Sequence, residues 1–382
     1  MRRLLFIFSF LSLLVVDGKA QEVETLTLED CLRIGIDNNL SLEGKRKEIQ
    51  KSKYGVSENR SKLLPQITVI AGYNNNFDPP VSVTDGSSYG VPYNITKTLQ
   101  HTANAGLEMQ MPLFNQTLYT SMSIAKVMEE ISRLSYGKAR EDIIMQISKM
   151  YYLGQVTAEQ IVLIKANITR LEELRDITQA FFDNGMSMEV DLKRVNINLE
   201  NLKVQYDNAQ AMMKQQLNML KYIMDYPAEK EFVLTPVNTD SITTVALTGL
   251  SENIYELQLS QSQVQLAEKQ KKIISNGYIP SLSLTGSWRY AAYTDKGYHW
   301  FHSGPSNHWF RSYGLGLTLR IPIFDGLDKT YKIKKAMIDI ENRKLAWENA
   351  RKSLQTQYLN AVNDLMNNQR NFKKQKDNYL LA

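Results

Sequence analysis

Apolar residues spaced three and four positions apart run through the middle of the chain and constrain its fold more than any other feature. After position 190 the spacing is held by Leu192, Val195, Leu199, Leu202, Tyr206, Ala209, Met213 and Leu220. Before position 182 it is held, with one slip in phase after Leu171, by Ile161, Ile164, Ile168, Leu171, Leu174, Ile177 and Phe181. Such spacing is typical of helices that pack as a coiled coil. The two segments are therefore expected to form one antiparallel helical hairpin.

The sequence between these helices predicts a tight turn at residues 184–187. Gly185 can adopt the positive φ that ends an incoming helix, and Ser187 is a candidate N-cap for the outgoing one. Glu189 and Asp191 suit the positive end of that second helix. If the first helix begins near residue 115, it is on the order of 100 Å long at about 1.5 Å per residue, which is longer than a globular domain requires.

The first 20 residues have the pattern of a secretory signal peptide. Arg2 and Arg3 precede an apolar run over residues 4–16, and Gly18-Lys19-Ala20 forms a small-x-small cleavage site. The remaining sequence has no apolar stretch of membrane-spanning length, so any insertion into a membrane would have to use strands. We expect an exported protein.

The charge balance and the single cysteine exclude some classes of protein. The formal net charge is +5, and Lys and Arg are interspersed with Asp and Glu along the helical segments, which indicates a solvated coiled-coil surface rather than a nucleic-acid-binding one. Cys31 is the one cysteine, so no internal disulfide can form. Because it lies among Leu28, Leu32 and Ile34, we expect it to be a small buried apolar residue.

Two pairs of segments alternate apolar and polar residues with the period of β-strands. The first pair covers residues 67–74 and 102–111, and the second covers residues 282–290 and 313–321. Residues 75–97, rich in Pro, Gly, Ser and Asn, predict a long loop between the first two strands, and residues 291–307 predict an aromatic-rich loop between the second two. Helices are predicted over residues 41–62 and 251–276, before the strand pairs.

This pattern of helix, strand pair and long helix occurs twice. Leu64-Pro65-Gln66-Ile67 corresponds to Ile279-Pro280-Ser281-Leu282, and residues 106–115 correspond to residues 316–325 with an offset of 210. The same offset carries Gly185 beyond Ala382. The second helical hairpin is therefore expected to be incomplete in this chain, without its tip and its final helix.

The four predicted strands resemble those of membrane β-barrels. They are flanked by aromatic residues such as Trp288 and Trp309, although a small soluble sheet with one buried face is the alternative. Four strands cannot close a barrel, for which about eight is the practical minimum, so several chains would share one. The side chains that alternation directs into the lumen are Asn104, Glu108, Gln110 and Arg320. They would either influence selectivity or simply keep the lumen wet.

Several motifs together resemble the TolC-type outer-membrane efflux proteins. They are the Leu-Pro-Gln-Ile strand entry, the strand exits Pro112-Leu113-Phe114-Asn115 and Pro322-Ile323-Phe324-Asp325, the turn Phe182-Asp183-Asn184-Gly185, and the helix end at residues 220–227. The resemblance implies an α+β membrane protein in which a homotrimer shares a twelve-stranded β-barrel above a periplasmic α-barrel of antiparallel coiled coils. It also implies a passive exit duct in the outer membrane that docks to a periplasmic adaptor and an inner-membrane pump, as in tripartite efflux or type I secretion. Adaptor contacts would fall on Asn184, Gly185, Met186 and Ser187, although Asn184 stands where the family often has an apolar residue.

The expected organisation follows from the repeat and the resemblance. In chain order it comprises a signal peptide (1–20), an equatorial N-terminal helix with the first long helix (21–64), the first barrel strand pair with an extracellular loop (65–114), the long helical hairpin (115–227), an equatorial segment (228–250), the helix of the second repeat (251–279), the second strand pair with its loop (280–324) and the incomplete second hairpin (325–382).

His299, His302 and His308 are the one candidate metal site, because three imidazoles in one loop could ligate zinc or copper. Their spacing is not helical and no acidic residue or cysteine lies between them, so an exposed aromatic loop is the favoured interpretation. No hydrolase or metalloprotease motif is present, and neither an enzymatic activity nor a cofactor is predicted. The alternatives to a duct are a periplasmic coiled-coil scaffold without a pore, a secreted metal-binding protein and a truncated relative that does not assemble. The exported cargo is not specified by the sequence.

Overall fold

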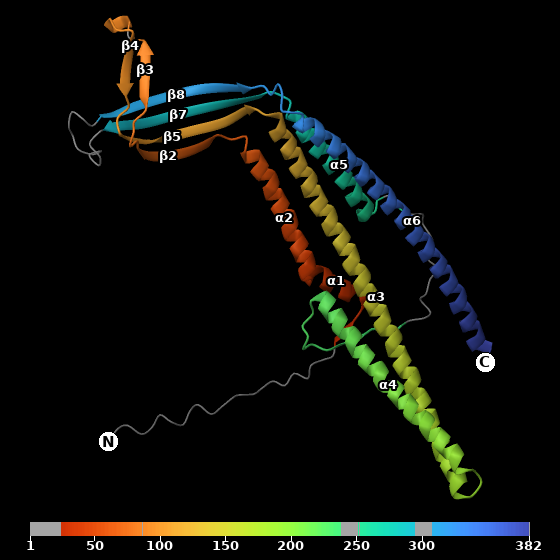
Figure 1. Cartoon of the computed structure of the whole chain (residues 1–382). Coiled ribbons are helices and arrows are strands. Elements are labelled where there is room, and N and C mark those ends of the chain that lie inside the picture. The colour runs from red at the N-terminus through yellow and green to blue at the C-terminus, as the bar shows by residue number, and fades with distance from the viewer. Residues whose placement is uncertain (1–23, 86, 238–250, 252, 295–307, 382) are drawn as a thin grey trace, which may run out of the picture. The chain divides into compact units, whose positions relative to one another are not determined.

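A computed structural model of the chain describes residues 24–85, 87–237, 251, 253–294 and 308–381 (Figure 1). The predicted signal peptide lies outside these residues. The chain divides into two units. The first comprises residues up to Gly44 and from Ala139 to Ala246, and the second comprises Lys45–Lys138 and Leu247–Ala382. Each unit is built from two separate parts of the sequence.

The predicted helical hairpin is confirmed as α3 (Gln116–Asp183) and α4 (Glu189–Met224). Gly185 has φ +72°, the N–H of Gly185 donates to Phe182 O at 2.9 Å, and the N–H of Met186 donates to Phe181 O at 2.8 Å. These are the two hydrogen bonds of a Schellman turn. The predicted N-cap at Ser187 is wrong: α4 begins one residue later, its N-cap is Met188 without a side-chain bond, and the Ser187 hydroxyl donates to Thr178 O on the incoming helix.

The contact between α3 and α4 follows the predicted heptads along most of its length. Leu199, Ala209 and Leu220 are buried on α4, and Ile164 is buried on α3. Past the phase slip, however, the last three predicted seam residues are exposed, with Leu174 at 45%, Ile177 at 54% and Phe181 at 51%. Because one residue corresponds to about 100° around a helix, the slip turns these side chains away from α4. They form a second apolar stripe on α3.

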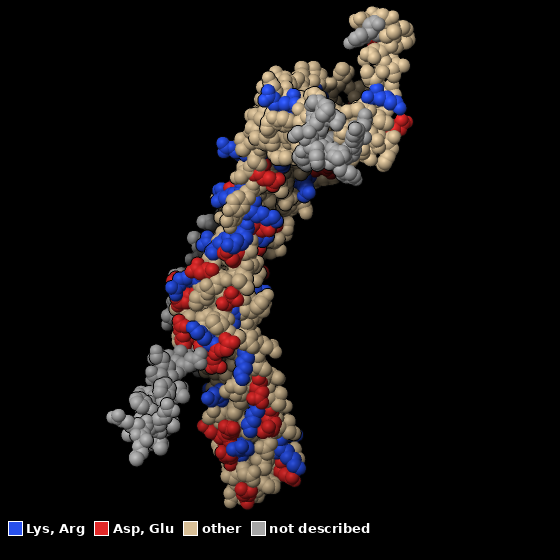
Figure 2. Space-filling model, turned by 90° about the vertical axis from the view of Figure 1, so that its left-hand side faces the viewer, with Lys and Arg blue, Asp and Glu red and all other residues tan. Residues whose placement is uncertain are grey.

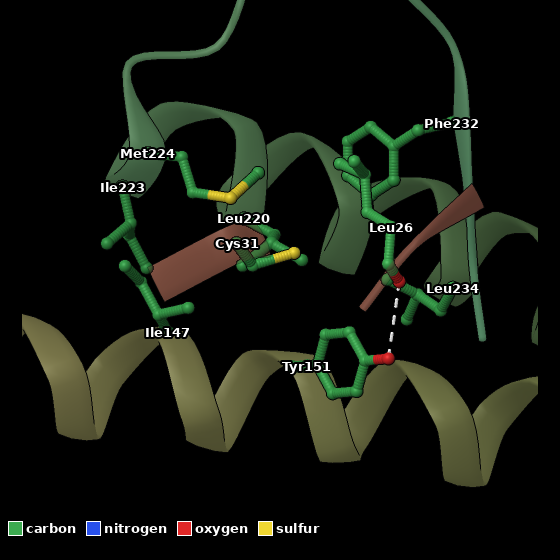
Figure 3. Packing of buried hydrophobic residues seen from close by; sticks show 9 residues of the cluster. All are labelled: Leu26, Cys31, Ile147, Tyr151, Leu220, Ile223, Met224, Phe232 and Leu234. Atoms are coloured by element: carbon green, nitrogen blue, oxygen red, sulfur yellow. Dashed lines mark hydrogen bonds between the residues drawn. The ribbon is translucent and has the colours of Figure 1, made fainter. Parts of the chain in front are cut away.

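The first unit contains a compact core of buried apolar side chains (Figure 3). Two short parallel strands, β1 (Glu24–Leu26) and β6 (Phe232–Leu234), and helix α1 (Leu28–Asn38) pack beside α3 and α4. The buried side chains are Leu26, Cys31, Ile147, Tyr151, Leu220, Ile223, Met224, Phe232 and Leu234. The Tyr151 hydroxyl donates to Leu26 O at 3.3 Å, so the one phenol in this core is satisfied. Cys31 is fully buried, as predicted, and burial raises the pKa of its thiol to about 12.

Polar caps hold α1 in place against this core. Thr27 and Asp30 form the capping box of α1: the N–H of Asp30 donates to Thr27 Oγ1 at 3.2 Å, and the N–H of Thr27 donates to Asp30 Oδ2 at 3.3 Å. At the other end, Asn39 is buried and its Nδ2 donates to Ile223 O at 2.7 Å. Its Oδ1 accepts from the N–H of Leu42 at 3.1 Å, so this one amide joins two helices.

The second unit contains a four-stranded antiparallel sheet in the order β2-β5-β7-β8. The strands are β2 (Gln66–Asn75), β5 (His101–Phe114), β7 (Ser281–Thr294) and β8 (His308–Arg320), close to the predicted positions. The helices are α2 (Leu40–Ser61), which begins in the first unit, α5 (Tyr255–Asn276) and α6 (Asp328–Leu381). The predicted repeat is visible because each strand pair is preceded by a helix of 22 residues and followed by a much longer one.

Two predicted loops contain more strand than expected. The segment 75–97 was predicted to lack regular structure, but it includes a hairpin of β3 (Val81–Asp85) and β4 (Tyr93–Lys97) with a short 3₁₀ helix, η1 (Ser87–Tyr89), between them. The prediction fails there because each strand is only five residues long and is surrounded by Pro, Gly and Ser. Similarly, β7 continues through residues 291–294, which were assigned to the second loop.

Among the described helices, none combines the length and the hydropathy that crossing a membrane would require.

Candidate functional site

The register of the sheet brings the four predicted lumen residues to the same face. Gln110 pairs with Thr285, which in turn pairs with Gly316, and Ser281 pairs with Arg320. Residues an even number of positions apart on a strand share a face, so Asn104, Glu108 and Gln110 lie on the face that also carries Arg320. This polar face, as we call it, includes Gln66 and Thr68 of β2.

A charged residue that was not among the predicted lumen residues, Arg289, also lies on the polar face. Its guanidinium forms an ion pair with Glu108 across β5 and β7. The directly opposite residue on β5 is Gly106, where a Cβ would come within 2.9 Å of both Cα and Cγ of Arg289. Gly106 therefore leaves the space in which the arginine stem lies flat against the sheet. The sequence does contain a signal for this position of Arg289. It lies between Trp288 and Tyr290 in a predicted strand, and strand alternation puts it on the face opposite these two aromatic residues.

The polar face is hollowed rather than flat. A depression of about 500 Å³ is lined by side chains from β2, β5 and β7, including Gln66, Thr68, Glu108, Gln110 and Arg289. The β8 residues that border it include Gly314 and Gly316, which contribute no side chain to fill it. The face therefore presents hydroxyl, amide and charged groups around an open space that water can fill.

The opposite face of the sheet is apolar and exposed. Leu107 is 38% exposed, Leu317 is 67% exposed and Leu315 is 81% exposed. Trp288 and Tyr290 lie on this face with their rings edge to face at 5.3 Å. Figure 2 shows Lys, Arg, Asp and Glu mixed along the helical part of the chain, whereas the part that holds the sheet, seen there from the end of its strands, is mostly uncharged. Large apolar side chains in such exposed positions indicate a surface that is covered by something outside the chain.

Among the strands that the structure describes, the two outer strands of the sheet are paired on one side only. The order β2-β5-β7-β8 leaves β2 and β8 as the edges. Each edge presents a row of backbone N–H and C=O groups that a further strand can pair with. Because the sheet has an even number of antiparallel strands, β2 of a second copy would run antiparallel to β8 of the first.

The predicted contact residues at the hairpin tip are close together because they form the Schellman turn itself. Asn184 Nδ2 donates to Ala180 O at 2.7 Å, so this side chain closes the end of α3. Met186 and Met188 flank the turn and are 76% and 74% exposed. Met188 was not among the predicted residues, although it is nearly as exposed as Met186.

The candidate metal loop is not tested by the structure. His299 and His302 lie outside the described residues, and the side chain of His308 at the start of β8 is not described. Within the part of the chain that is described, no three His, Cys, Asp or Glu side chains are grouped so as to hold a metal ion.

Comparison with known proteins decides the family. The model of the family described as "Outer membrane efflux protein" matches residues 34–224, which is half of the chain. The chain belongs to this family. Members of the outer membrane efflux protein family are efflux channels rather than enzymes, and membership places the protein in the outer membrane with its helical part in the periplasm.

A curated relative is an outer membrane protein of Vibrio cholerae. Outer membrane protein TolC of Vibrio cholerae serotype O1 is 21% identical over 316 residues, which cover 81% of this chain and 66% of the relative. The chain thus spans about two thirds of the length of that protein.

Two solved structures illustrate the shared fold. A membrane protein from Pseudomonas aeruginosa matches with a TM-score of 0.72 and 17% identity, over 91% of this chain and 78% of that one. The Campylobacter jejuni CmeC outer membrane channel matches with a TM-score of 0.63 and 18% identity, over 93% of this chain and 77% of that one. At such identities the likeness establishes the fold, a combination of long helices with a small strand sheet.

Proposed function

We propose that the protein is the outer-membrane component of a tripartite efflux or type I secretion system and serves as a passive exit duct. The observation that carries this proposal is the sheet with an exposed apolar face, a hollowed polar face and two unpaired edges. In water this arrangement would expose both apolar side chains and backbone groups. In a membrane it becomes favourable once the edges are paired, because lipid covers the apolar face and water fills the polar one.

Three copies of the chain close the sheet in this proposal. Pairing β8 of each copy with β2 of the next gives twelve antiparallel strands without a free edge, which fits a homotrimer that shares one barrel. The strands are 10 to 14 residues long, and a tilted membrane strand needs about 9 to 11. The family and fold support this arrangement.

The helices extend the duct into the periplasm. The stripe of Leu174, Ile177 and Phe181 on α3 has a counterpart in Val190, Ile197 and Val204 on α4, spaced seven residues apart and exposed. Helices that have one apolar seam need one partner, whereas helices with two can pack side by side into a closed ring. These stripes support lateral packing of neighbouring hairpins into an α-barrel.

Conduction needs a wide wet lumen and no bond chemistry. The lumen of the strand barrel would be lined by Asn104, Glu108, Gln110 and Arg320, together with Arg289. Because Glu108 and Arg289 neutralise each other, Arg320 is the charged residue of this lining that has no ion-pair partner within the described part of the chain. The pump and the adaptor, rather than this lining, would choose the cargo.

The hairpin tip is the proposed contact with the periplasmic adaptor. Asn184, Gly185, Met186 and Ser187 form a rigid turn, and the exposed Met186 and Met188 provide flexible apolar side chains that can pack against a partner. The inner-membrane pump would complete the assembly.

Reconstitution tests the proposed duct. The purified full chain in detergent should migrate as a heat-modifiable trimer and should give stepwise conductance in a planar phospholipid bilayer. A protein that leaves the membrane fraction without detergent, remains monomeric and does not conduct would contradict the duct and favour a pore-free periplasmic scaffold.

A further inference from the structure

All junctions between helices and the four-stranded sheet lie at one end of that sheet. Gln66, which follows α2, pairs with Gln110 near the start of α3, and Ser281, which follows α5, pairs with Arg320 before α6. In the proposed duct, on which this inference rests, that end is the periplasmic boundary of the outer membrane. β7 and β8, with 14 and 13 residues, are long enough to cross the hydrocarbon layer and reach these junctions, so the proposed duct has its hydrocarbon edge near them.

The segment between β8 and α6 has the composition of a membrane interface. Ile323 is 94% exposed and Phe324 is 80% exposed, and Tyr331 is also exposed in the first turn of α6. Tyr side chains are enriched where hydrocarbon meets headgroups, and exposed Ile and Phe side chains suit the adjoining hydrocarbon. The segment is held in place, since Asp325 forms an ion pair with Lys329 at 3.0 Å and the Lys329 ammonium lies 5.0 Å from the ring centroid of Tyr278.

Lysines crowd the two helices immediately next to this segment. They are Lys269, Lys271 and Lys272 at the end of α5, and Lys329, Lys332, Lys334 and Lys335 at the start of α6. The acidic residues nearby are Glu268, Asp325, Asp328 and Asp339, and two of these are already paired, with Lys329 and Lys332. Within the described ranges of the chain, Lys334 and Lys335 have no ion-pair partner.

Lys334 and Lys335 share one helix face with Tyr331, which precedes them by three and four residues. The Lys334 ammonium lies 5.6 Å from the centroid of the Tyr331 ring. Beside them, a hollow of about 280 Å³ between α5 and α6 is lined by Gln270, Lys332, Lys335 and Asp339, with Ala267 and Ala336 forming a buried floor. The two alanines leave this space open, and the ammonium groups of Lys332 and Lys335, the Gln270 amide, the Asp339 carboxylate and the Ile274 side chain border it.

We infer that this surface, the junction patch of Lys332, Lys334, Lys335, Gln270 and Tyr331, binds the headgroup of an anionic phospholipid in the periplasmic leaflet. The phosphodiester carries one negative charge and accepts hydrogen bonds from the lysine ammonium groups. Headgroup hydroxyls would meet Gln270 and Asp339, and the acyl chains would extend along Ile323 and Phe324. Clustered juxtamembrane lysines attract anionic lipid through such contacts, and a basic pocket between helices makes the attraction specific for a headgroup.

The test measures lipid preference on the full-length protein. The protein is reconstituted into nanodiscs of equal parts phosphatidylglycerol and phosphatidylcholine, released, and examined by native mass spectrometry for the lipids that it retains. The wild type should retain phosphatidylglycerol preferentially, and Lys334→Gln/Lys335→Gln should reduce that preference roughly tenfold or more. The matched control, Lys373→Gln/Lys374→Gln at the far end of the same helix, should keep it. Inorganic phosphate added before release should not displace the lipid.

Equal retention of both lipids by the wild type, equal losses in the two double variants, or displacement by inorganic phosphate would overturn the inference. Retained lipid is counted per protein chain, whereas conductance and trimer content are measured separately. A conducting trimer without lipid preference therefore refutes the junction patch alone, and a chain that neither assembles nor conducts refutes the duct.

Discussion

The small core of the first unit and the strand sheet of the second differ in where their apolar side chains lie: those of the core are buried within the chain, and those of the sheet are exposed on its surface. Leu220 is 1% exposed and belongs to a cluster contributed by β1, α1, α3, α4 and β6. Leu317 is 67% exposed, although it belongs to an equally regular apolar pattern. The first region is completed by its own chain, whereas in the proposed duct the second is completed by lipid and further copies of the chain. Leucines in a regular apolar pattern therefore stabilise the folded chain in the first unit, whereas in the second unit they form the surface at which the proposed assembly meets lipid.

A charge on the apolar face of the sheet should have the largest effect. Leu317→Arg is expected to cost about 2–4 kcal/mol per chain in a membrane, three times over in a trimer, because the guanidinium must leave water. Heat-modifiable trimers in the outer-membrane fraction should disappear.

Thr318→Arg is the matched control, since it adds the same charge one residue along on the polar face. It should leave trimers intact. Equal loss in both variants would remove the distinction between the two faces.

Truncation in the closed core should have the next largest effect. Leu220→Ala should destabilise the first unit by about 2–5 kcal/mol, because it removes buried contacts and leaves a cavity. Hydrogen–deuterium exchange should show faster exchange of α1 and α4 amides, without a change in β7 or β8. Met219→Ala, one residue earlier and 44% exposed, should change little. Faster exchange in β7 and β8 would mean that the two regions do not behave independently.

The sequence predicts those elements whose residue pattern is repeated many times, and it misses those that depend on a few residues. Heptads and alternation are repeated over many residues, so they predict α3, α4 and the four strands, and they also put Asn104, Glu108, Gln110 and Arg320 on one face. Patterns carried by only a few residues fail: the β3–β4 hairpin is too short, and the cap at Ser187 depends on where the turn ends. The ion pair of Arg289 was not predicted, because its partner Glu108 is 181 residues away in the sequence, on another strand. Such a pairing depends on register, which alternation alone does not give.

The hairpin tip should respond more modestly. Gly185→Ala should destabilise the turn by roughly 1–2 kcal/mol, because a Cβ is unfavourable at φ +72°. The thermal midpoint of the helical signal in circular dichroism should fall. Gly55→Ala is the contrasting variant, since that glycine lies inside α2 with open space around it and should gain stability from better helix propensity. A turn unaffected by Gly185→Ala would argue against the Schellman geometry.

The smallest effect concerns pH and the capping box of α1. The hydrogen bond from the Thr27 hydroxyl, at 2.7 Å, is the main cause that lowers the pKa of Asp30 below its usual 3.8. A carboxyl whose pKa is lowered by folding contributes stability above the unfolded value, and that contribution is lost as the pH falls through the folded value. Acid titration of the wild type should therefore show a loss of stability below about pH 4 that Thr27→Val reduces. An unchanged acid profile would exclude this cap as its source.

Site-directed spin labelling of β8 in lipid tests the central claim, that the sheet has one face in lipid and one in water, most directly. With Cys31→Ser as the background, cysteines at 315–319 are labelled one at a time and examined for collisions with oxygen, which enriches in lipid, and with a nickel chelate, which stays in water. The account predicts a strict alternation, with labels at 315, 317 and 319 accessible to oxygen and labels at 316 and 318 accessible to nickel. Labels at 315, 317 and 319 that reach neither reagent would reveal a dry protein core and contradict the duct.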